Sequence, residues 1–290
     1  MKKFLILIPV YDDWESLNKL LSEINDAIAD FSSNEFSCIV VNDASKKKQT
    51  GITKPNNIKI LKIINMKENR GHARCNAFGL RYIVQNENFD FLIVMDGDGE
   101  DRPEEIKKII PKILSEKNSS VFAKRIKRSE GPIFQLLYKI HKILTFIFTG
   151  KNINFGNYSC LIKKDVQNIS NKASLWSSFS GTLKKYIQNY TEIDSIRGKR
   201  YFGPSKMSLL NLLIHSFSII AVFKKVVFFR SAILLILICL LSINLNTYFF
   251  LIFLLLLIFN IMIYLTSLRE NQKDLENSTN NIKDINTFTQ

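Results

Sequence analysis

Two long apolar stretches near the C-terminus constrain the fold of this chain most strongly. They cover residues 226–245 and 248–268, and each approaches the roughly 20 residues that a helix needs to cross the core of a bilayer. The second stretch has no charged residue, and the first has only Arg230, near its start. A buried hairpin in a soluble core is the alternative, but these lengths favour two transmembrane helices.

Basic residues flank the outer ends of this pair but not its turn. Lys224 precedes the first stretch and Arg269 follows the second, whereas residues 244–247 between them carry no charge. Because basic flanks stay on the cytoplasmic side of a membrane, both outer ends are predicted to face the cytoplasm. The opening apolar run, residues 4–10, is too short for a signal peptide. We therefore expect a multi-pass protein of the cell membrane whose N-terminal domain is cytoplasmic.

The first 125 residues alternate short apolar runs with amphipathic segments. The apolar runs predict strands and the amphipathic segments predict helices. The predicted strands are residues 4–10, 37–42, 58–65, 91–95 and 120–123, and the predicted helices are 14–31, 71–85 and 103–116. This alternation indicates an α/β fold with a mostly parallel sheet that is flanked by helices.

The rest of the chain divides by composition. Residues 132–149 form an apolar segment interspersed with basic residues, which either lies in the membrane interface or packs as a core helix. The tail, residues 269–290, is polar and is predicted to be disordered. The expected organisation is an α/β domain in 1–215, a link in 216–225, two membrane helices in 226–268, and the tail.

The net charge of +14 suits anionic lipids, phosphorylated ligands or nucleic acid. No aromatic and basic platform or helix-turn-helix pattern is present, so no nucleic-acid partner is expected. The four cysteines show no metal-binding or disulfide spacing. The lipid bilayer and phosphorylated ligands therefore remain as expected partners.

Carboxylates follow three of the predicted strands. Asp13 follows the first strand, Asp43 the second, and Asp96 and Asp98 follow the strand at 91–95. Ligands bind where the carboxyl ends of parallel strands meet. Mg²⁺ and Mn²⁺ prefer one or two carboxylates plus phosphate oxygens of a substrate. The pattern predicts a metal and diphosphate site, and the alternative is an acidic turn in which Asp101 caps a helix.

In this order and spacing, the chain resembles the family 2 glycosyltransferases, which have the GT-A fold. Residues 8–13 resemble the opening Pro-x-Tyr-Asn-Glu element of that family, and residues 41–45 resemble its Asp-Asp-Gly-Ser element. Residues 69–71 resemble its Asn-x-Gly turn, and Asp96 and Asp98 its Asp-x-Asp motif. The likeness covers about residues 1–215.

Residues 200–206 are similar to the Arg-x-x-Gly-x-Ser-Lys element of the polyprenyl-phosphate sugar transferases, the branch that includes dolichol-phosphate mannose synthase. Some bacterial members of the branch carry a C-terminal two-helix anchor. The resemblance implies a nucleotide-sugar donor (UDP- or GDP-sugar), Mg²⁺ or Mn²⁺, and a polyprenyl phosphate or another membrane-associated acceptor.

The resemblance also implies roles for individual residues. The implied nucleotide-binding residues are Pro9, Tyr11, Asp13, Asp43 and Asp96, and the implied metal ligands are Asp96, Asp98 and Glu100. The implied phosphate or acceptor residues are Arg125, Arg200, Ser205 and Lys206, and the implied catalytic residues are Asp98, Arg125, Arg200 and Lys206. For the basic residues, a solvated or lipid-facing surface is the alternative.

The chain departs from the family pattern at three places. Asn42 replaces the first Asp of its pair, Glu100 and Asp101 replace the usual Gln and His, and residues 156–159 stand where the branch often has Ser-Gly-Phe-Arg. The last departure bears on the acceptor, because that loop is expected to approach it.

The lack of acids and histidines in residues 166–191 bears on the class of the acceptor. A hydroxyl acceptor needs a general base, whereas a lipid phosphate is already anionic. Residues 166–191 contain no Asp, Glu or His, although Asp165 directly precedes them. This favours a polyprenyl phosphate. A transferase acting on a sugar hydroxyl and a catalytically silent membrane scaffold are the alternatives; the sugar, the choice of UDP or GDP and a homo-oligomeric state stay open.

Overall fold

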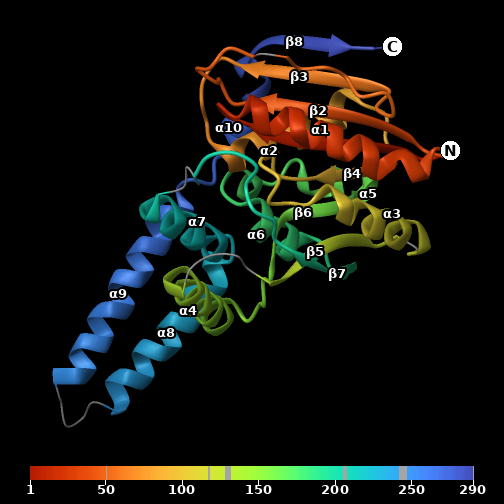
Figure 1. Ribbon diagram of the computed structural model, residues 1–290. Helices are drawn as coiled ribbons and strands as arrows, with labels where there is room; N and C mark the ends of the chain where they lie inside the picture. The colour runs from red at the N-terminus through yellow and green to blue at the C-terminus, as the bar shows by residue number, and fades with distance from the viewer. Residues whose placement is uncertain (50, 117, 128–131, 205–207, 242–246, 290) are drawn as a thin grey trace.

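The computed structural model describes residues 1–289 except 50, 117, 128–131, 205–207 and 242–246. It contains one eight-stranded sheet with the strand order β7-β5-β6-β4-β1-β2-β3-β8 (Figure 1). The strands are β1 Lys3–Val10, β2 Glu35–Asn42, β3 Ile60–Met66, β4 Phe91–Val94, β5 Ser120–Lys127, β6 Phe155–Ile162, β7 Tyr190–Ile196 and β8 Ile282–Phe288. The α-helices are α1 Trp14–Ile28, α2 His72–Asn86, α3 Ile106–Ser115, α4 Pro132–Thr149, α5 Lys163–Ile169, α6 Phe179–Tyr186, α7 Leu209–Ala221, α8 Lys224–Leu241, α9 Thr247–Ser267 and α10 Gln272–Glu276.

The centre of the sheet is parallel, as predicted. β1 pairs with β4 on one side and with β2 on the other, and β3 continues the parallel set. Every residue of β1 after Lys3 is buried, because helices cover both faces of the sheet. The predicted strands and helices of the first 125 residues are confirmed, with boundaries shifted by a few residues at most.

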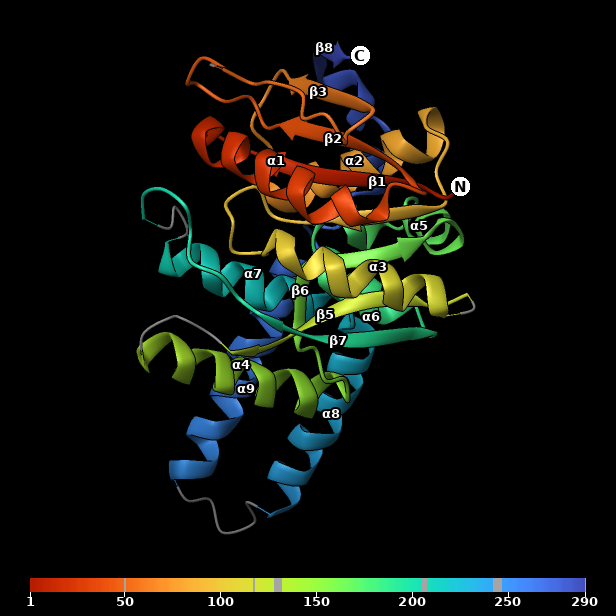
Figure 2. The same ribbon diagram turned by 45° about the vertical axis from the view of Figure 1, so that its right-hand side comes forward.

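The sheet divides the core into two layers, and helices cover the layer on each face of the sheet. Phe4, Ile6 and Ile8 point to the layer that contains α1 and α3, which lie side by side on that face (Figure 2). Leu5 and Leu7 point to the opposite layer, which contains α2, α6 and α7. This alternation follows from the two-residue period of a strand. Packing of helices on both faces of the sheet thus fixes the positions of the strand ends.

The tail does not match its prediction, and the expectation of disorder is wrong. After α9 the chain returns to the α/β domain, forms α10 and a 3-10 turn at Ser278–Asn281, and ends in β8. β8 pairs antiparallel with β3, from Asn65 opposite Asp284 to Leu61 opposite Phe288. Backbone pairing with an open strand edge orders a segment whose own side chains are mostly polar.

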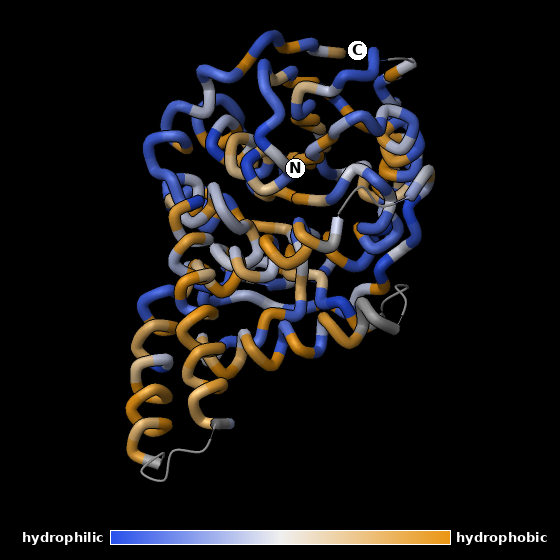
Figure 3. The backbone as a smooth tube through the Cα atoms, turned by 90° about the vertical axis from the view of Figure 1, so that its left-hand side faces the viewer, coloured by the Kyte–Doolittle hydropathy of each residue, from blue (hydrophilic) through white to orange (hydrophobic). Residues whose placement is uncertain are grey.

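α8 and α9 form a hairpin that projects from the α/β domain and is strongly hydrophobic (Figure 3). Among the described residues, one segment, Tyr248–Glu276, is long and apolar enough to cross a membrane, and only 17% of its apolar window is buried. Lys224 at the start of α8 pairs with Glu270 after α9, N to O 2.8 Å, so both outer ends of the hairpin meet. Arg230 in α8 donates to the carbonyl oxygen of Ile147 at 2.8 Å and so caps the end of α4.

Candidate active site

The predicted carboxylates gather at one edge of the sheet, because β4, β1 and β2 are parallel neighbours. Pro9 lies at the end of β1 beside the Asp96–Asp98 turn, where a Cβ atom on Gly97 would come within 2.9 Å of the Pro9 carbonyl oxygen. Gly97 therefore allows the turn to pass directly against β1. Asp43 directly follows β2, one strand further along.

Asp96 is held by polar groups from two distant segments. Its Oδ1 accepts from Asn157 Nδ2 at 3.0 Å and lies 3.3 Å from His72 Nε2. Burial acts to raise the pKa of Asp96, but the charges of His72 and Arg125 and the Asn157 hydrogen bond outweigh burial and lower the pKa. Asp96 therefore stays ionised, as a metal ligand must.

Asp98 is bound by an arginine and by the turn itself. Its Oδ2 accepts from Arg200 Nη1 at 2.6 Å, and its Oδ1 accepts from the Glu100 backbone N at 3.0 Å. Burial, followed by the charges of Asp96 and Glu100, raises the pKa of Asp98 to about 6. The Glu100 N–H hydrogen bond and the Arg200 charge lower the pKa but do not outweigh these causes.

Asp101 supports the turn from below and does not cap a helix. It is 4% exposed, and its Oδ2 accepts from the Asp96 backbone N at 3.0 Å. Burial, followed by the charge of Asp96, raises the pKa of Asp101 to about 7. Arg125, on β5, lies 3.6 Å from Asp101 Oδ1 and only 13% of its side chain is exposed. Arg125 thus belongs to the carboxylate cluster, as an inner charge and not as a surface one.

A strap after β7, residues 197–201, lies over the carboxylate turn. Gly198 N donates to the Glu100 carbonyl oxygen at 2.8 Å, and Tyr201 N donates to that of Asp98 at 3.0 Å. Arg197 pairs with Glu100, and Arg200 bridges Asp98 and Asp13. The implied metal ligand Glu100 and the implied nucleotide residue Asp13 are therefore both paired with arginines of the strap.

The implied nucleoside residues line the ends of β1 and β2. The carboxylate of Asp43 accepts from the backbone N of Arg70 at 2.7 Å and of Gly71 at 2.8 Å, so it holds the turn that opens α2. Asp13 accepts from Ser16 Oγ at 2.6 Å, and Tyr11 is partly buried between these loops. Ser205 and Lys206, the other residues expected here, lie outside the described residues.

Several residues of this cluster were not assigned from the sequence. Asn157, Arg197 and Asp101 contact the predicted carboxylates, and His72 contacts Asp96. Burial, followed by the charges of His72 and His141, lowers the pKa of His215 in α7 to about 4. The sequence carries no signal for these contacts, because the partners are far apart along the chain. Asn157 and Asp101 had only an indirect signal, as departures from the family pattern.

The donor set fits a divalent cation that arrives with a diphosphate. Asp96 and Asp98 offer hard oxygen ligands, and the charges of Asp96 and Glu100 add to burial in raising the pKa of Asp98. Within the described part of the chain, no three His, Cys, Asp or Glu side chains form a complete metal site. A cation here would therefore depend on substrate oxygens for the rest of its ligands, as Mg²⁺ commonly does.

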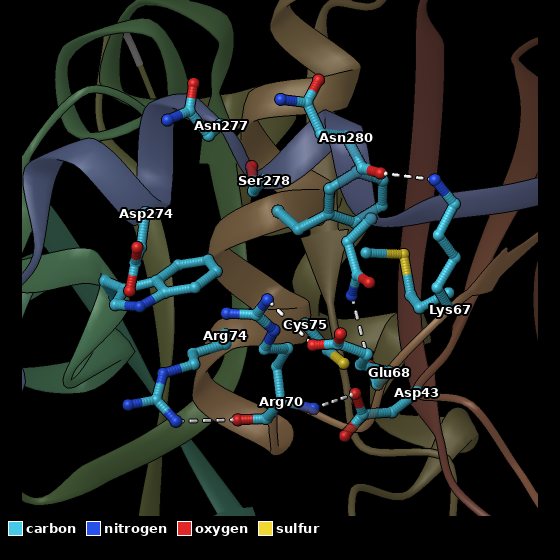
Figure 4. Close-up of a pocket in the computed structure, with 14 residues that line it drawn as sticks. Asp43, Lys67, Glu68, Arg70, Arg74, Cys75, Asp274, Asn277, Ser278 and Asn280 are labelled. Carbon is cyan, nitrogen blue, oxygen red and sulfur yellow. Dashed lines mark hydrogen bonds and ion pairs between the residues drawn. The ribbon is translucent and has the colours of Figure 1, made fainter.

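A separate cavity of about 270 Å³ lies behind the turn that Asp43 holds (Figure 4). Its walls include Arg70 and Arg74 from the α2 region, Trp176, and Asn277 and Asn280 from the tail. The Arg74 guanidinium lies 5.7 Å from the centre of the Trp176 ring. The acids after β4 do not line this cavity, so it adjoins the site only through Asp43.

The fold and the site together define a GT-A protein. The chain belongs to glycosyl transferase family 2, because the model of that family matches residues 5–178. Two curated relatives are undecaprenyl-phosphate 4-deoxy-4-formamido-L-arabinose transferases. The protein from Photorhabdus laumondii is 28% identical over 223 residues, and that from Serratia proteamaculans is 24% identical over 225 residues. The aligned region covers 73% of this chain and 65% of each relative, so the chain spans just under two thirds of their length.

Solved structures support the fold. Glucosyl-3-phosphoglycerate synthase from Mycobacterium tuberculosis, in complex with Mn²⁺, UDP and phosphoglyceric acid, aligns with a TM-score of 0.52 at 11% identity over 78% of each chain. TarS from S. aureus, in complex with UDP-GlcNAc, aligns with a TM-score of 0.50 at 16% identity over 77% of this chain and 66% of TarS. At these identities the likeness shows the GT-A fold alone.

Proposed function

We propose that this chain transfers a sugar from a nucleotide-sugar donor to a polyprenyl phosphate at the cytoplasmic face of a membrane. The observation that carries the proposal is a carboxylate and arginine cluster in a chain that also has an exposed apolar helical surface. The names of the two curated relatives point to the same class of acceptor. The family and the geometry support a nucleotide-sugar as the donor.

The apolar surface is made by four helices that pack together below the sheet. α9 packs against α7 and α8, and α4 packs against α7 and α8. One face of α4 exposes large apolar side chains at Leu136, Ile140, Ile143 and Ile147, a helical stripe that suits a membrane interface. The expected amphipathic segment, residues 132–149, is this helix. We propose that α4 lies in the interface and that α8 and α9 cross the membrane as a hairpin.

The chain's own residues then divide the chemical work. Asp96 and Asp98 would hold Mg²⁺ or Mn²⁺, and the cation would neutralise the departing nucleoside diphosphate. Arg200 and Arg125 would add fixed positive charge where the phosphates lie. Because Arg200 now bridges Asp13 and Asp98, donor entry would require it to exchange carboxylate partners for phosphate oxygens. Ser205 and Lys206 stay predicted phosphate contacts.

The position of Asp165 supports an acceptor that needs no general base. β6 runs antiparallel to β4, so α5, which follows β6, starts at the sheet edge opposite Asp96. Asp165 Oδ2 accepts from Ser120 Oγ at 2.5 Å, at the first residue of β5. Asp165, which directly precedes the acid-free residues 166–191, therefore lies away from the site. This leaves an acceptor that is already anionic as the simpler choice.

A sugar hydroxyl is the second candidate acceptor, and one contact favours it. His72 lies beside Asp96 and is hydrogen-bonded to Asn157, with 2.6 Å between His72 Nε2 and Asn157 Nδ2. A histidine next to a carboxylate is a common general base. If the acceptor is a hydroxyl, His72 is the residue that we expect to take its proton.

A transfer assay tests the proposal and separates the two acceptors. Membranes that contain the chain would be incubated with radiolabelled UDP- and GDP-sugars, Mg²⁺ or Mn²⁺, and a short polyprenyl phosphate. Label that enters a mild-acid-labile lipid supports the proposal and identifies the sugar. Label that enters only saccharide supports the hydroxyl acceptor, and no transfer to either acceptor leaves a silent scaffold. Membranes with the Asp98→Asn chain serve as the background control.

A further inference from the structure

The C-terminal strand connects to the donor loops through a line of hydrogen bonds across the sheet. Asn65 Nδ2 on β3 donates to Asp284 Oδ1 on β8 at 2.5 Å, and Asn42 Nδ2 at the end of β2 donates to Asn65 Oδ1 at 2.8 Å. We call Asp284, Asn65 and Asn42 the amide ladder. It spans three neighbouring strands at the edge where the site lies.

The ladder continues into the loops after β2 and β1. Ser45 N donates to Asn42 Oδ1 at 3.0 Å, and Asp12 N donates to Ser45 Oγ at 2.8 Å. Asp12 Oδ1 in turn accepts from Lys47 N at 2.8 Å. Asp12 and Ala44 both have positive φ, of 51° and 55°, so each loop holds a backbone conformation that needs support.

The chemistry of the end groups sets the direction of the ladder. An ionised carboxylate only accepts, so Asp284 requires the amide NH₂ of Asn65 to point toward it. The Asn65 oxygen then faces Asn42, which must donate with its NH₂ and accept Ser45 N with its oxygen. An aspartate at position 42 cannot make that donation. Asn42, which departs from the family pattern, is therefore matched to the tail of this chain.

The tail also contacts the turn after β3, residues 67–71, which opens α2. Lys67 N donates to the Asn281 carbonyl oxygen at 2.7 Å, and Lys67 Nζ donates to that of Asn280 at 2.9 Å (Figure 4). Asn281 Nδ2 donates to the Glu68 carbonyl oxygen at 3.2 Å. The next residues, Arg70 and Gly71, are those that Asp43 binds through their backbone N–H groups. The turn is thus fixed on one side by Asp43 and on the other by the tail.

We propose that the C-terminal segment, residues 272–288, is a positioning element of the donor site. The positioning residues are Asp284 within this segment and its partner Asn42 at the end of β2. The proposal rests on the proposed function, since it assigns the loops after β1 and β2 to the donor nucleoside. Because the segment follows α9, it also links the membrane hairpin to the donor loops through a continuous chain.

A purely protective role for β8 makes a different prediction. An added edge strand shields β3 from pairing with other chains whatever its side chains do. In that case, the loss of the Asp284 carboxylate would affect β8 and β3 alone. If the ladder positions the loops, the effect reaches residues 43–48, which follow β2 and so lie one strand pairing beyond β3.

The experiment compares four variants of the full chain in detergent. Asp284→Ala removes the acceptor at the end of the ladder, and Asn42→Asp places Asn65 between two carboxylates, of which it can donate to only one. Asn42→Asp combined with Asp284→Asn restores one donor and one acceptor at each step. Asn286→Ala, on the same exposed side of β8 two residues further along, is the matched control.

Two readouts are measured for each variant. Hydrogen exchange of the peptide that covers residues 43–48 needs no substrate, and we expect faster exchange in both single variants. The donor KM is expected to rise about threefold to tenfold, as for the loss of one net hydrogen bond, while kcat changes less. The double variant should return both values toward wild type, and Asn286→Ala should change neither.

The proposal is overturned if exchange quickens only in β3 and β8, or if the double variant fails to rescue the single ones. An unchanged donor KM in an active enzyme also overturns it. Failure of the proposed function gives a different pattern, in which wild type transfers no sugar while the exchange data still show whether the ladder holds the loops.

Discussion

The two halves of this protein treat apolar side chains in opposite ways. In β1 every apolar residue is at most 4% exposed, whereas in α9 large residues such as Leu255 and Tyr264 are 65% and 55% exposed. Both segments are rich in Leu, Ile and Phe, so composition does not separate them. The difference lies in the surroundings: β1 is covered by helices on both faces, and α9 has a covering only along part of one side. An exposed apolar surface of this size suits the membrane contact that we propose for the hairpin.

Charge is distributed in the opposite sense. The α/β half gathers the partly buried Asp96 and Asp98 and the buried Asp101, and offsets their charge with arginines and a histidine. The described part of α8 after Arg230, and all of α9, carry no charged residue. This contrast fits the two proposed roles, because clustered charges are typical of a functional site, whereas charged residues are costly within a membrane span. The predictions below test each half of this comparison.

The largest effect is expected in the carboxylate cluster. Asp98→Asn should lower transfer by at least about 100-fold, because the proposed role of Asp98 is to hold the cation that neutralises charge on the departing diphosphate. The fold should persist, since Arg200 keeps Asp13 as a partner. Sugar transfer and the circular-dichroism melting curve are compared with those of Asp30→Asn, an exposed acid paired with Lys107. Full activity of Asp98→Asn would remove this residue from the site.

The next effect concerns the anchor. Leu255→Lys should reduce membrane insertion strongly, because a lysine at the centre of a membrane helix costs about 2.5 to 3.5 kcal/mol. Leu114→Lys, at a 43% exposed position of α3, is the control, and such surface changes usually stay within about 0.5 kcal/mol. The measurement is the fraction of protein that resists carbonate extraction. Equal fractions for both variants would contradict a membrane role for α9.

A pH effect should follow from the buried acid Asp101. Its pKa in the folded chain is raised to about 7, so between about pH 4 and pH 7 the folded state binds this proton more tightly than the unfolded state does. Its contribution to stability therefore falls as the pH rises through that window. Asp101→Asn removes the titration and keeps an oxygen that accepts from Asp96 N. The variant should gain stability relative to wild type from pH 4 to pH 7 in metal-free urea melts, and a constant difference would contradict the assignment.

The smallest effect is expected where the two halves meet. Arg230→Leu removes the donor that caps α4 and should cost about 1 kcal/mol or less of unfolding free energy. It also removes the only charge within the first apolar stretch, so membrane insertion should be unchanged or improved. Thermal melts in detergent and carbonate extraction measure the two effects. A loss of insertion would show that Arg230 anchors the hairpin at the lipid headgroups instead.

The strands and helices up to residue 125 could be predicted because the information is local. An apolar run such as residues 4–10 can be buried on both faces only as a covered strand, and an amphipathic segment such as 14–31 needs one buried side. The convergence of Asp13, Asp43 and Asp96 followed from the parallel order of the strands. The metal and nucleotide roles of these residues stay predictions.

The order of the tail and the contacts of the strap were decided by tertiary structure. Residues 282–288 carry few apolar residues, and they are ordered by pairing with the open edge of β3. This strand lies far away in the sequence: Asn65 and Asp284, which are hydrogen-bonded, are 219 residues apart. Arg200 pairs with Asp13 and Asp98, which lie 187 and 102 residues earlier in the chain. Sequence patterns report which face of a segment is apolar, because burial acts on each element separately. Hydrogen bonds and ion pairs depend on which two groups the fold brings within about 3 Å, and that distance is set only when all elements have packed.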